Sequence, residues 1–371
     1  MTAGREIAGF AIPFAAGTAI SMAFPIVSTG FPHASFPVLA AIISVCIFIL
    51  LTSSHKEYHS AALWAAIIIS ALACGAVCCI TADWLAVSGN NSDGWLNSLT
   101  EPFGSRLKQT ISDLPFKNAQ TGALINSLIT GDRSGLDMHT KSIFRQSGAS
   151  HILALSGMHL GIIYGILKLL LSPIGNSRKA LTIRSVTTTF ICLFYTIMTG
   201  AGPSITRAFI FIFLYETAAA VGRKGNTGEI LMTSLIIHLT IFPDDIRQVG
   251  FLLSYAAMAG IAYIYPAFNK LWTDVSGGPV VKGWKWIWTS ASVAIACQIT
   301  TGPIAYICFG TFPEYFLLTN LLAAPLVGLI IPWGLVVSGL HAAGICPEFL
   351  TTGLEFIIQT FTGILEIIAA L

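Results

Sequence analysis

Long apolar runs separated by short polar stretches are the main pattern along this chain. A helix that spans a bilayer needs about 20 largely apolar residues. Eleven runs approach that length, at 7–27, 34–53, 61–80, 151–171, 184–199, 204–221, 229–243, 250–267, 285–306, 314–340 and 349–371. The tenth run contains Pro325 and Pro332, so we expect it to be kinked or broken into two half-helices. The pattern predicts an all-α, polytopic membrane protein with about eleven transmembrane helices.

The widest gap between these runs follows the third and has the pattern of short helices. Four apolar residues in it are spaced by four, four and three positions: Phe103, Leu107, Ile111 and Leu114. They predict one face of a helix that begins near Pro102 and lies flat on the membrane surface. Two more helices are expected at 118–129 and 137–147, followed by Gly131 and Gly148 as C-terminal stops.

The runs and the gap divide the chain into three predicted parts. These are N-terminal transmembrane helices (1–80), a helical extracytoplasmic segment (81–150) and a second block of transmembrane helices (151–371). The orientation follows from lysine and arginine, which concentrate in cytoplasmic loops. With the N-terminus in the cytoplasm, the inner segments hold most of these residues and the short outer loops hold only Arg247. An odd number of spans then places Leu371 outside.

Composition excludes an ordinary soluble domain. Hydrophobic residues make up 54% of the chain and charged residues only 10%, whereas soluble domains carry roughly 25% charged residues. The mean hydropathy is +0.77, which fits a chain that has lipid as its main solvent. The net charge of +2 gives no sign of an acidic partner.

Several motifs of enzymes are missing from the sequence. It has no G-x-x-x-x-G-K-[ST] phosphate loop and no H-E-x-x-H metal motif. The eight cysteines lie mostly inside apolar runs without metal-ligand spacing, so we interpret them as packing residues. We therefore expect no catalytic residues, no metal and no cofactor.

The densest polar cluster in an apolar run opens the predicted fourth span. It contains His151, Ser156 and His159, which are costly in lipid unless they face protein or water. The glycines Gly157, Gly161 and Gly165 form a small-xxx-small series that favours close helix packing. Three interpretations remain open here: polar bonds at a tight helix crossing, a polar lining of a transport path, and a serine–histidine pair of an intramembrane protease.

Arg207 is the basic residue of a second cluster, which runs from Gly200 to Arg207. Pro203 and Ser204 predict the start of a helix on the outer side of the membrane, with Arg207 about one turn further in. One interpretation is an anchor whose charged end snorkels to the interface. The other is an anion contact, because a helix N-terminus beside an arginine favours negative charge.

The last span carries a polar stripe at positions i, i+4, i+7 and i+11. The residues are Glu355, Gln359, Thr362 and Glu366. The stripe is either a seam between helices or the lining of a proton path that uses Glu355 and Glu366. Other polar residues of the apolar runs are each interpreted as a packing bond when taken singly: Glu216, His238, Gln248, Ser254, Gln298 and Asn320.

Several motifs occur together in an order that resembles a known family. They are Leu128–Leu136, Phe144–Gly148, His151–Gly161, Pro203–Ala208, Val249–Tyr255, and the residues Gly302, Pro303, Phe309, Gly310, Asn320 and Pro325. This series is similar to the competence region of ComEC-type DNA-uptake proteins and covers roughly residues 115–340.

The resemblance implies a channel that passes single-stranded DNA across the bacterial cytoplasmic membrane during natural transformation, with 151–371 as its channel domain. Its transport path would be lined by His151, Ser156, His159, Arg207, Gln248, Ser254 and Asn320. Asp132 and Arg133 would lie at the outer mouth. The acidic stripe of the last span would repel a polyanion if it faced the same path.

Two departures from the family suggest a short form. Residues Thr81–Leu114 are too few for the oligonucleotide-binding-like domain that ComEC-like proteins commonly carry. The 371 residues also contain no His-x-His-x-Asp-His motif of the metallo-β-lactamase-like domain. Two interpretations follow: either these parts come from separate chains, or the short form has a different function. In the first case the expected partners are a separate nuclease, a separate DNA-binding protein and a cytoplasmic helicase, beside membrane lipid and single-stranded DNA. The sequence does not define an oligomeric state.

Two other functions remain as alternatives. The first is a proton-coupled secondary transporter of a small anion or metabolite, with Glu355 and Glu366 on its proton path. The second is a membrane scaffold without transport, in which the buried polar residues only pack helices.

Overall fold

The computed structural model describes residues 9, 11–19, 95–175, 177–220, 225–272, 278–310 and 315–371. Every regular element that it assigns in these residues is helical. The first part of the fold comprises α4 (Trp95–Ser112), α5 (Ala119–Thr130), α6 (Met138–Gln146), α7 (Ser150–Leu153), α8 (Gly157–Leu170), η1 (Ser172–Ile174), α9 (Arg178–Met198), α10 (Pro203–Ala220) and α11 (Thr227–Ile241). The second part comprises η2 (Pro243–Arg247), α12 (Val249–Ala259), η3 (Gly260–Ile264), α13 (Tyr265–Lys270), α14 (Pro279–Phe309), α15 (Phe316–Ala342) and α16 (Glu348–Ala369).

Six segments of the described part are long and apolar enough to cross a membrane. They are Gly157–Ile174, Arg178–Met198, Val249–Lys270, Pro279–Phe309, Phe316–Ala342 and Glu348–Ala369. The all-α character predicted from the sequence is thereby confirmed for the described residues, and these six segments are candidate membrane spans. The total of about eleven spans stays a prediction. The expected spans 34–53 and 61–80, and most of 7–27, lie outside the described residues.

The predicted fourth span is interrupted in the structure. The single turn α7 ends at Leu153, and the chain runs extended through Ala154 (φ −77°, ψ 131°) before α8 starts at Gly157. Ser156 therefore precedes the helix and does not lie within it, which corrects the expectation of one continuous helix over 151–171. The sequence hides this break because the segment is long, largely apolar and contains no proline.

Two expectations based on proline are corrected by the structure. Helix α15 is not broken into two half-helices, because it continues through Pro325 and Pro332 without interruption, whereas a kink at these prolines stays a prediction. Helix α4 begins at Trp95, seven positions before Pro102, which lies inside it. Packing explains both cases, because neighbouring helices stabilise a helix around a missing backbone N–H. Helix α15 contacts α5, α8, α14 and α16, and α4 contacts α5, α9 and α15.

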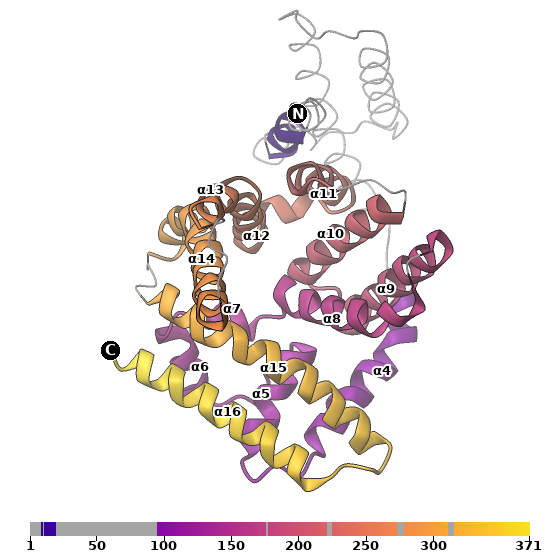
Figure 1. The fold of residues 1–371 in the computed structure, drawn as a ribbon, viewed down its shortest axis with the longest axis vertical. Coiled ribbons are helices and arrows are strands. Elements are labelled where there is room, and N and C mark those ends of the chain that lie inside the picture. Colours follow the sequence, from indigo (N-terminus) through magenta and orange to yellow (C-terminus); the bar gives the residue numbers. More distant parts are fainter. Residues whose placement is uncertain are drawn as a thin grey trace, which may run out of the picture.

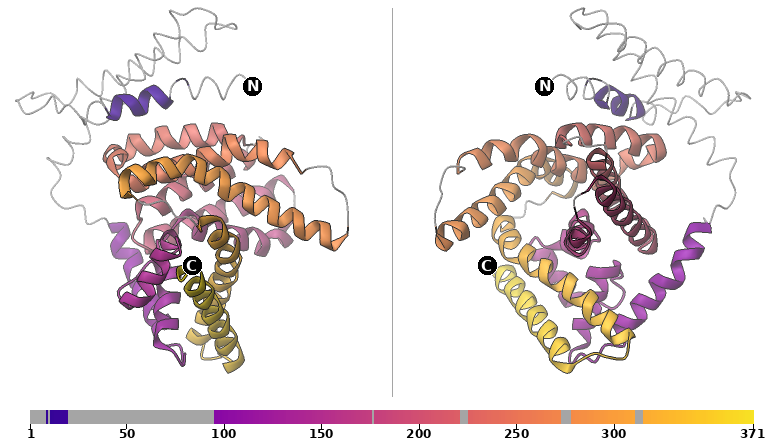
Figure 2. Two further views of the ribbon diagram at one scale, coloured as in Figure 1. Left: turned by 90° about the vertical axis from the view of Figure 1, so that its left-hand side faces the viewer. Right: turned by 45° about the vertical axis from the view of Figure 1, so that its right-hand side comes forward.

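The helices that precede Gly148 share one hydrophobic core with the C-terminal hairpin. Figures 1 and 2 show α4, α5 and α6 beside the antiparallel pair α15 and α16. Phe144 of α6 meets Phe361 of α16 edge to face, with ring centroids 5.6 Å apart. Gly334 of α15 lies so close to α5 that a Cβ there would be 3.0 Å from Cδ1 of Ile129. The predicted surface helix is thus part of a packed bundle, whereas the extracytoplasmic location of this segment stays a prediction.

Glycine ends two helices of this segment, as the sequence predicts. Gly131 follows α5 with φ +80°, and its amide donates to the carbonyl of Ser127. Gly148 follows α6 with φ +75°. Both backbones are in the left-handed region that favours glycine. The polar caps Asn118 and Asp137 hold the opposite ends of the same helices.

Candidate functional site

Helices α8, α10 and α12 surround a cavity of about 190 Å³. Six of its lining residues matter for chemistry: Gly157, Gly161, Ser204, Arg207, Ser254 and Tyr255. Most of the remaining wall is apolar, including Phe211 and Met258. The cavity thus brings together the arginine and the serine that the sequence analysis placed on the transport path in two separate spans.

The Arg207 side chain is buried in the cavity wall and is only 4% exposed. Its Nη2 donates to the carbonyl oxygen of Gly250 at 2.8 Å, and its guanidinium carbon lies 5.7 Å from the ring centre of Phe251. Nε and Nη1 have no hydrogen-bond partner among the described residues. Arg207 is therefore held between helices in the described part of the chain, and its role as an anion contact stays a prediction.

The Ser156–His159 pair closes the first turn of α8. The backbone N–H of Ser156 donates to Nδ1 of His159 at 3.2 Å, and the Ser156 hydroxyl lies 2.9 Å from the same nitrogen. This is a capping box in which the imidazole replaces the usual glutamate. His159 is completely buried, and its Nε2 lacks a partner in the described part of the chain. The pair forms a helix cap. The 2.9 Å contact also places the Ser156 hydroxyl within hydrogen-bonding reach of a base, so the protease interpretation stays a hypothesis.

His151 and Asn320 come together next to this break. The imidazole Nδ1 of His151 lies 3.1 Å from the carbonyl oxygen of Gly148, and the Asn320 side chain is within hydrogen-bonding reach of the same ring. Thr319 strengthens the contact because its hydroxyl donates to the Ser147 carbonyl oxygen at 2.6 Å. The start of α15 is therefore joined to α7, although 169 positions separate His151 from Asn320 in the sequence.

Gln248 lies outside the cavity, at the exposed junction between η2 and α12. Its Nε2 donates to Oδ1 of Asp245 at 2.7 Å. The other carboxylate oxygen, Oδ2, is 2.8 Å from Nε2 of the buried His238. The structure thus separates Gln248 from Ser254, which lines the cavity one and a half turns further along α12.

The three glycines of α8 do not form one packing series. A Cβ at Gly157 would lie 3.2 Å from the Cβ of Ala208, so α8 and α10 approach closely there. At Gly161 and Gly165 a Cβ would meet no described atom within 4 Å. Gly161 instead leaves space for the cavity, which is a different use of a small residue from the one expected.

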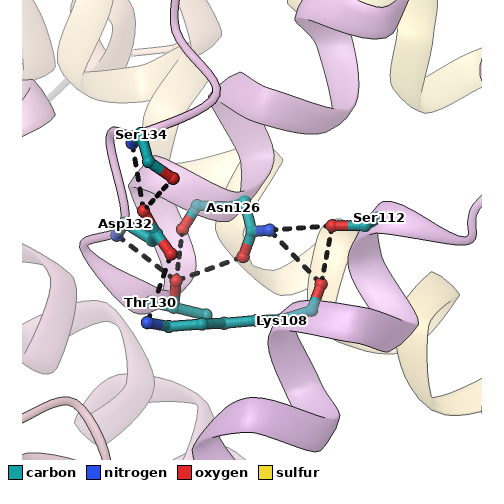
Figure 3. A network of polar contacts seen from close by, with 6 residues as sticks. All are labelled: Lys108, Ser112, Asn126, Thr130, Asp132 and Ser134. Carbon is teal, nitrogen blue, oxygen red and sulfur yellow. Dashed lines mark hydrogen bonds and ion pairs between the residues drawn. The ribbon is translucent and has the colours of Figure 1, made fainter.

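Polar contacts join the loop between α5 and α6 to Lys108 of α4 (Figure 3) and to Leu153 at the end of α7. Asp132 pairs with Lys108 of α4 at 3.2 Å and accepts hydrogen bonds from the Ser134 hydroxyl at 2.7 Å and the Ser134 amide at 3.0 Å. The Ser134 hydroxyl and amide, followed by Lys108, lower the pKa of Asp132 from 3.8 to about 2. Nε of Arg133 donates to the carbonyl oxygen of Leu153 at 2.9 Å. This loop therefore contacts the interruption between α7 and α8, where His151 and Ser156 lie.

The acidic stripe of α16 faces α5 and α6 and not the Arg207 cavity. Oε1 of Glu355 accepts a hydrogen bond from the Asn118 amide at 2.9 Å, and Oε2 accepts a longer one, 3.4 Å, from the Lys117 amide. Gln359, Thr362 and Glu366 line a second cavity of about 210 Å³ between these helices. Glu355 joins α16 to the start of α5, which agrees with a seam between helices at this end of the stripe. Gln359 and Glu366 are exposed, and a proton path through Glu355 and Glu366 stays a hypothesis.

One polar pair was missed as a pair by the sequence analysis. Glu216 of α10 is 1% exposed and forms an ion pair with Lys168 of α8 at 2.9 Å. The Tyr164 hydroxyl donates to the same carboxylate oxygen, Oε1. The sequence shows Glu216 and Lys168 as single charged residues in two different apolar runs. It does not indicate that they contact each other, because they are 48 positions apart.

Comparison with known proteins agrees with the ordered motifs. The model of the family described as "Competence protein" matches residues 128–371. ComE operon protein 3 of Bacillus subtilis is 26% identical over 159 residues, which are 43% of this chain and 20% of that protein. Recombination protein 2 of Haemophilus influenzae is 22% identical over 259 residues (65% of this chain, 32% of that protein).

A third relative is an uncharacterised protein, YcaI of Escherichia coli, at 23% identity over 70% of this chain and 34% of its own length. The aligned regions span between a fifth and about a third of these curated relatives. No solved structure matches the chain. The family match covers the break between α7 and α8, the Arg207 cavity and the C-terminal hairpin, and the chain belongs to the Competence protein family.

Proposed function

We propose that this chain is the membrane channel of a DNA-uptake system, which passes single-stranded DNA across the cytoplasmic membrane during natural transformation. The observation that carries the proposal is Arg207, a cation buried among three helices with N–H groups that no described residue satisfies. A polyanion needs positive charge along a polar route. Membership of the Competence family and the similarity to ComE operon protein 3 support this choice.

In the described conformation the route is closed. The Arg207 cavity of about 190 Å³ is smaller than the roughly 300–1,000 Å³ of pockets that hold drug-sized ligands. A nucleotide therefore passes only when α8, α10 and α12 separate. A Cβ at Gly161 or Gly165 would meet no described atom within 4 Å, so α8 is loosely packed at these positions. Loose packing favours movement of α8 away from α10 and α12.

The proposed path has two parts. Ser156 lies in the interruption before α8, with His151 of α7, His159 of α8 and Asn320 of α15 around it. Arg207 and Ser254 belong to the cavity beside it. We place the loop of Asp132 and Arg133 at the outer mouth, because Arg133 contacts the carbonyl of Leu153 at that interruption. Gln248, which is exposed and bound to Asp245, contributes only at the surface of α12.

The orientation that we propose puts the N-terminus in the cytoplasm and Leu371 outside. It places the basic residues at the predicted inner ends of α8, α9, α13 and α14 on the cytoplasmic side: Lys168, Arg178, Lys179, Arg184, Lys270, Lys282 and Lys285. Lysine and arginine favour that side of a membrane. A separate nuclease, a DNA-binding protein and a cytoplasmic helicase would complete the uptake system.

The test is uptake of labelled DNA by cells whose only copy of this chain carries Arg207→Met or Arg207→Lys. We expect Arg207→Met to lower uptake at least tenfold and Arg207→Lys to retain part of it, at equal protein levels. Arg178→Met is the matched control, because it removes one exposed charge at the start of α9. Normal uptake by Arg207→Met cells would contradict the proposed path.

A further inference from the structure

We propose that the cavity at Arg207 is a binding site for one singly charged phosphodiester group. The proposal deepens the function proposed above and rests on it for the identification of DNA as the source of that group. The site itself is argued from charge, space and polarity, and these are independent of transport.

The charge of Arg207 is not balanced within the described part of the chain. Two ion pairs between a lysine and a carboxylate occur there, Lys108–Asp132 and Lys168–Glu216, and neither includes Arg207. Asp245 is the carboxylate whose charge acts on Arg207, but its two oxygens are held by His238 and Gln248. A buried cation without a partner is costly, so the cavity favours an anion that supplies the missing charge.

The donors around the cavity fit an oxyanion. Nε and Nη1 of Arg207 have no hydrogen-bond partner among the described residues and are covered in this conformation. A ligand reaches them when the Arg207 side chain turns into the cavity, and guanidinium N–H groups form strong, charge-assisted hydrogen bonds with phosphate oxygens. Ser204, the second residue of α10, and Ser254 of α12 add hydroxyl groups to the same wall. Because Ser204 lies at the N-terminus of an 18-residue helix, the helix dipole also favours negative charge there.

The apolar remainder of the wall selects the charge state of the ligand. Phe211, Ile212 and Met258 offer no hydrogen bonds, so a doubly charged inorganic phosphate would lose hydration without sufficient replacement. A phosphodiester carries one negative charge and two carbon substituents, which match one arginine and an apolar surround. The volume of about 190 Å³ admits the diester group and its neighbouring atoms.

Two molecules carry this chemistry in a membrane, a nucleic acid strand and a phospholipid. The first experiment therefore uses the smallest probe, dimethyl phosphate, on the purified full chain in detergent. Neutral trimethyl phosphate and inorganic phosphate serve as matched controls. Binding is followed by phosphorus NMR line broadening and by the shift in the thermal unfolding midpoint.

We expect dimethyl phosphate to bind at least tenfold more tightly than either control. Arg207→Met should weaken that binding at least tenfold, whereas the exposed Arg178→Met should leave it unchanged. Gly161→Leu provides a second variant that keeps the charge, because its side chain enters space where a Cβ meets nothing within 4 Å. It should also abolish binding. Equal binding by wild type and both cavity variants would overturn the site.

A second pair of measurements identifies the source. A thymidine dinucleotide without terminal phosphates that competes with dimethyl phosphate supports DNA. Native mass spectrometry that finds phosphatidylglycerol bound to wild type and lost from Arg207→Met supports a lipid headgroup at the same phosphodiester site. The uptake experiment tests the channel separately from the site. If Arg207→Met cells lose DNA uptake but the wild-type chain does not bind dimethyl phosphate, the site is rejected and the channel is kept. If the wild-type chain binds dimethyl phosphate but Arg207→Met cells take up DNA normally, the site is kept and the proposed channel path is rejected.

Discussion

Glu355 of α16 and Asn118 of the loop before α5 are joined by a 2.9 Å hydrogen bond from the Asn118 amide to Oε1, across 237 positions of sequence. The carboxylate is only 5% exposed. It accepts hydrogen bonds from backbone N–H groups at the start of α5, where no preceding helical turn supplies carbonyl acceptors for them. The sequence pattern places Glu355 on a possible proton path. In the structure Glu355 of α16 caps the start of α5.

Glu355→Ala should destabilise the fold, because it leaves the amides of Lys117 and Asn118 without their acceptor. We expect a loss of about 1–3 kcal/mol, the range for an unsatisfied buried polar group. Glu355→Gln keeps an acceptor oxygen and should lose less. Thermal unfolding in detergent, compared with Glu366→Gln at the exposed end of the stripe, measures the difference. Equal midpoints for Glu355→Ala and wild type would contradict the capping role.

Asp132 should make the loop between α5 and α6 sensitive to acid. Its pKa in the folded chain is about 2, below 3.8, so its ion pair and hydrogen bonds stabilise the fold above about pH 4 and are lost as the pH falls towards 2. Hydrogen exchange at the amide of Ser134, which bonds to Asp132, should therefore accelerate between about pH 4 and pH 2, after correction for intrinsic rates. Asp132→Asn should remove that change. The same pH response in both proteins would count against it.

The glycines of α8 should respond differently to alanine. At Gly157 a Cβ would be 3.2 Å from that of Ala208, so Gly157→Ala must push α8 from α10. Gly161→Ala meets nothing within 4 Å and gains up to about 1 kcal/mol in helix propensity. We therefore expect Gly157→Ala to unfold at a lower temperature than wild type and Gly161→Ala at a similar or higher one. The opposite order would show that α8 and α10 do not pack as described.

The ion pair of Lys168 and Glu216 should behave as a coupled unit. Lys168→Met leaves a carboxylate buried without its cation, which typically costs about 3–5 kcal/mol. Since the Lys168 side chain is one-third exposed, we expect the low end of that range. The double variant Lys168→Met with Glu216→Gln should recover most of the loss. Additive losses in a double-mutant cycle would mean that the two side chains do not interact.

Local signals in the sequence predict part of this structure well. Gly131 and Gly148 mark the ends of α5 and α6 because glycine adopts the left-handed backbone at low cost. The length and apolarity of the runs predict the long helices that are candidate membrane spans. These features depend on neighbours within one or two turns, and such neighbours are visible in the sequence.

The candidate site needs information that spacing does not contain. Arg207 and Ser254 each stand out as polar residues in apolar runs, but their common cavity depends on how α10 meets α12. The interruption at Ala154 and the continuity of α15 through Pro325 and Pro332 depend on packing against other elements as well. Tertiary contacts therefore determine where a helix is interrupted or continues and which helices meet, and periodicity and proline position do not predict these features.

The joint core of α5, α6, α15 and α16 also constrains how the chain is made. The buried faces of Leu128 and Phe144 share one hydrophobic core with residues of α15 and α16, which are synthesised after them. Until α15 and α16 have been made, part of the apolar surface of α5 and α6 is uncovered, and membrane lipid or a chaperone has to shield it. The packing of the first helices is therefore completed only after α15 and α16 have emerged from the ribosome.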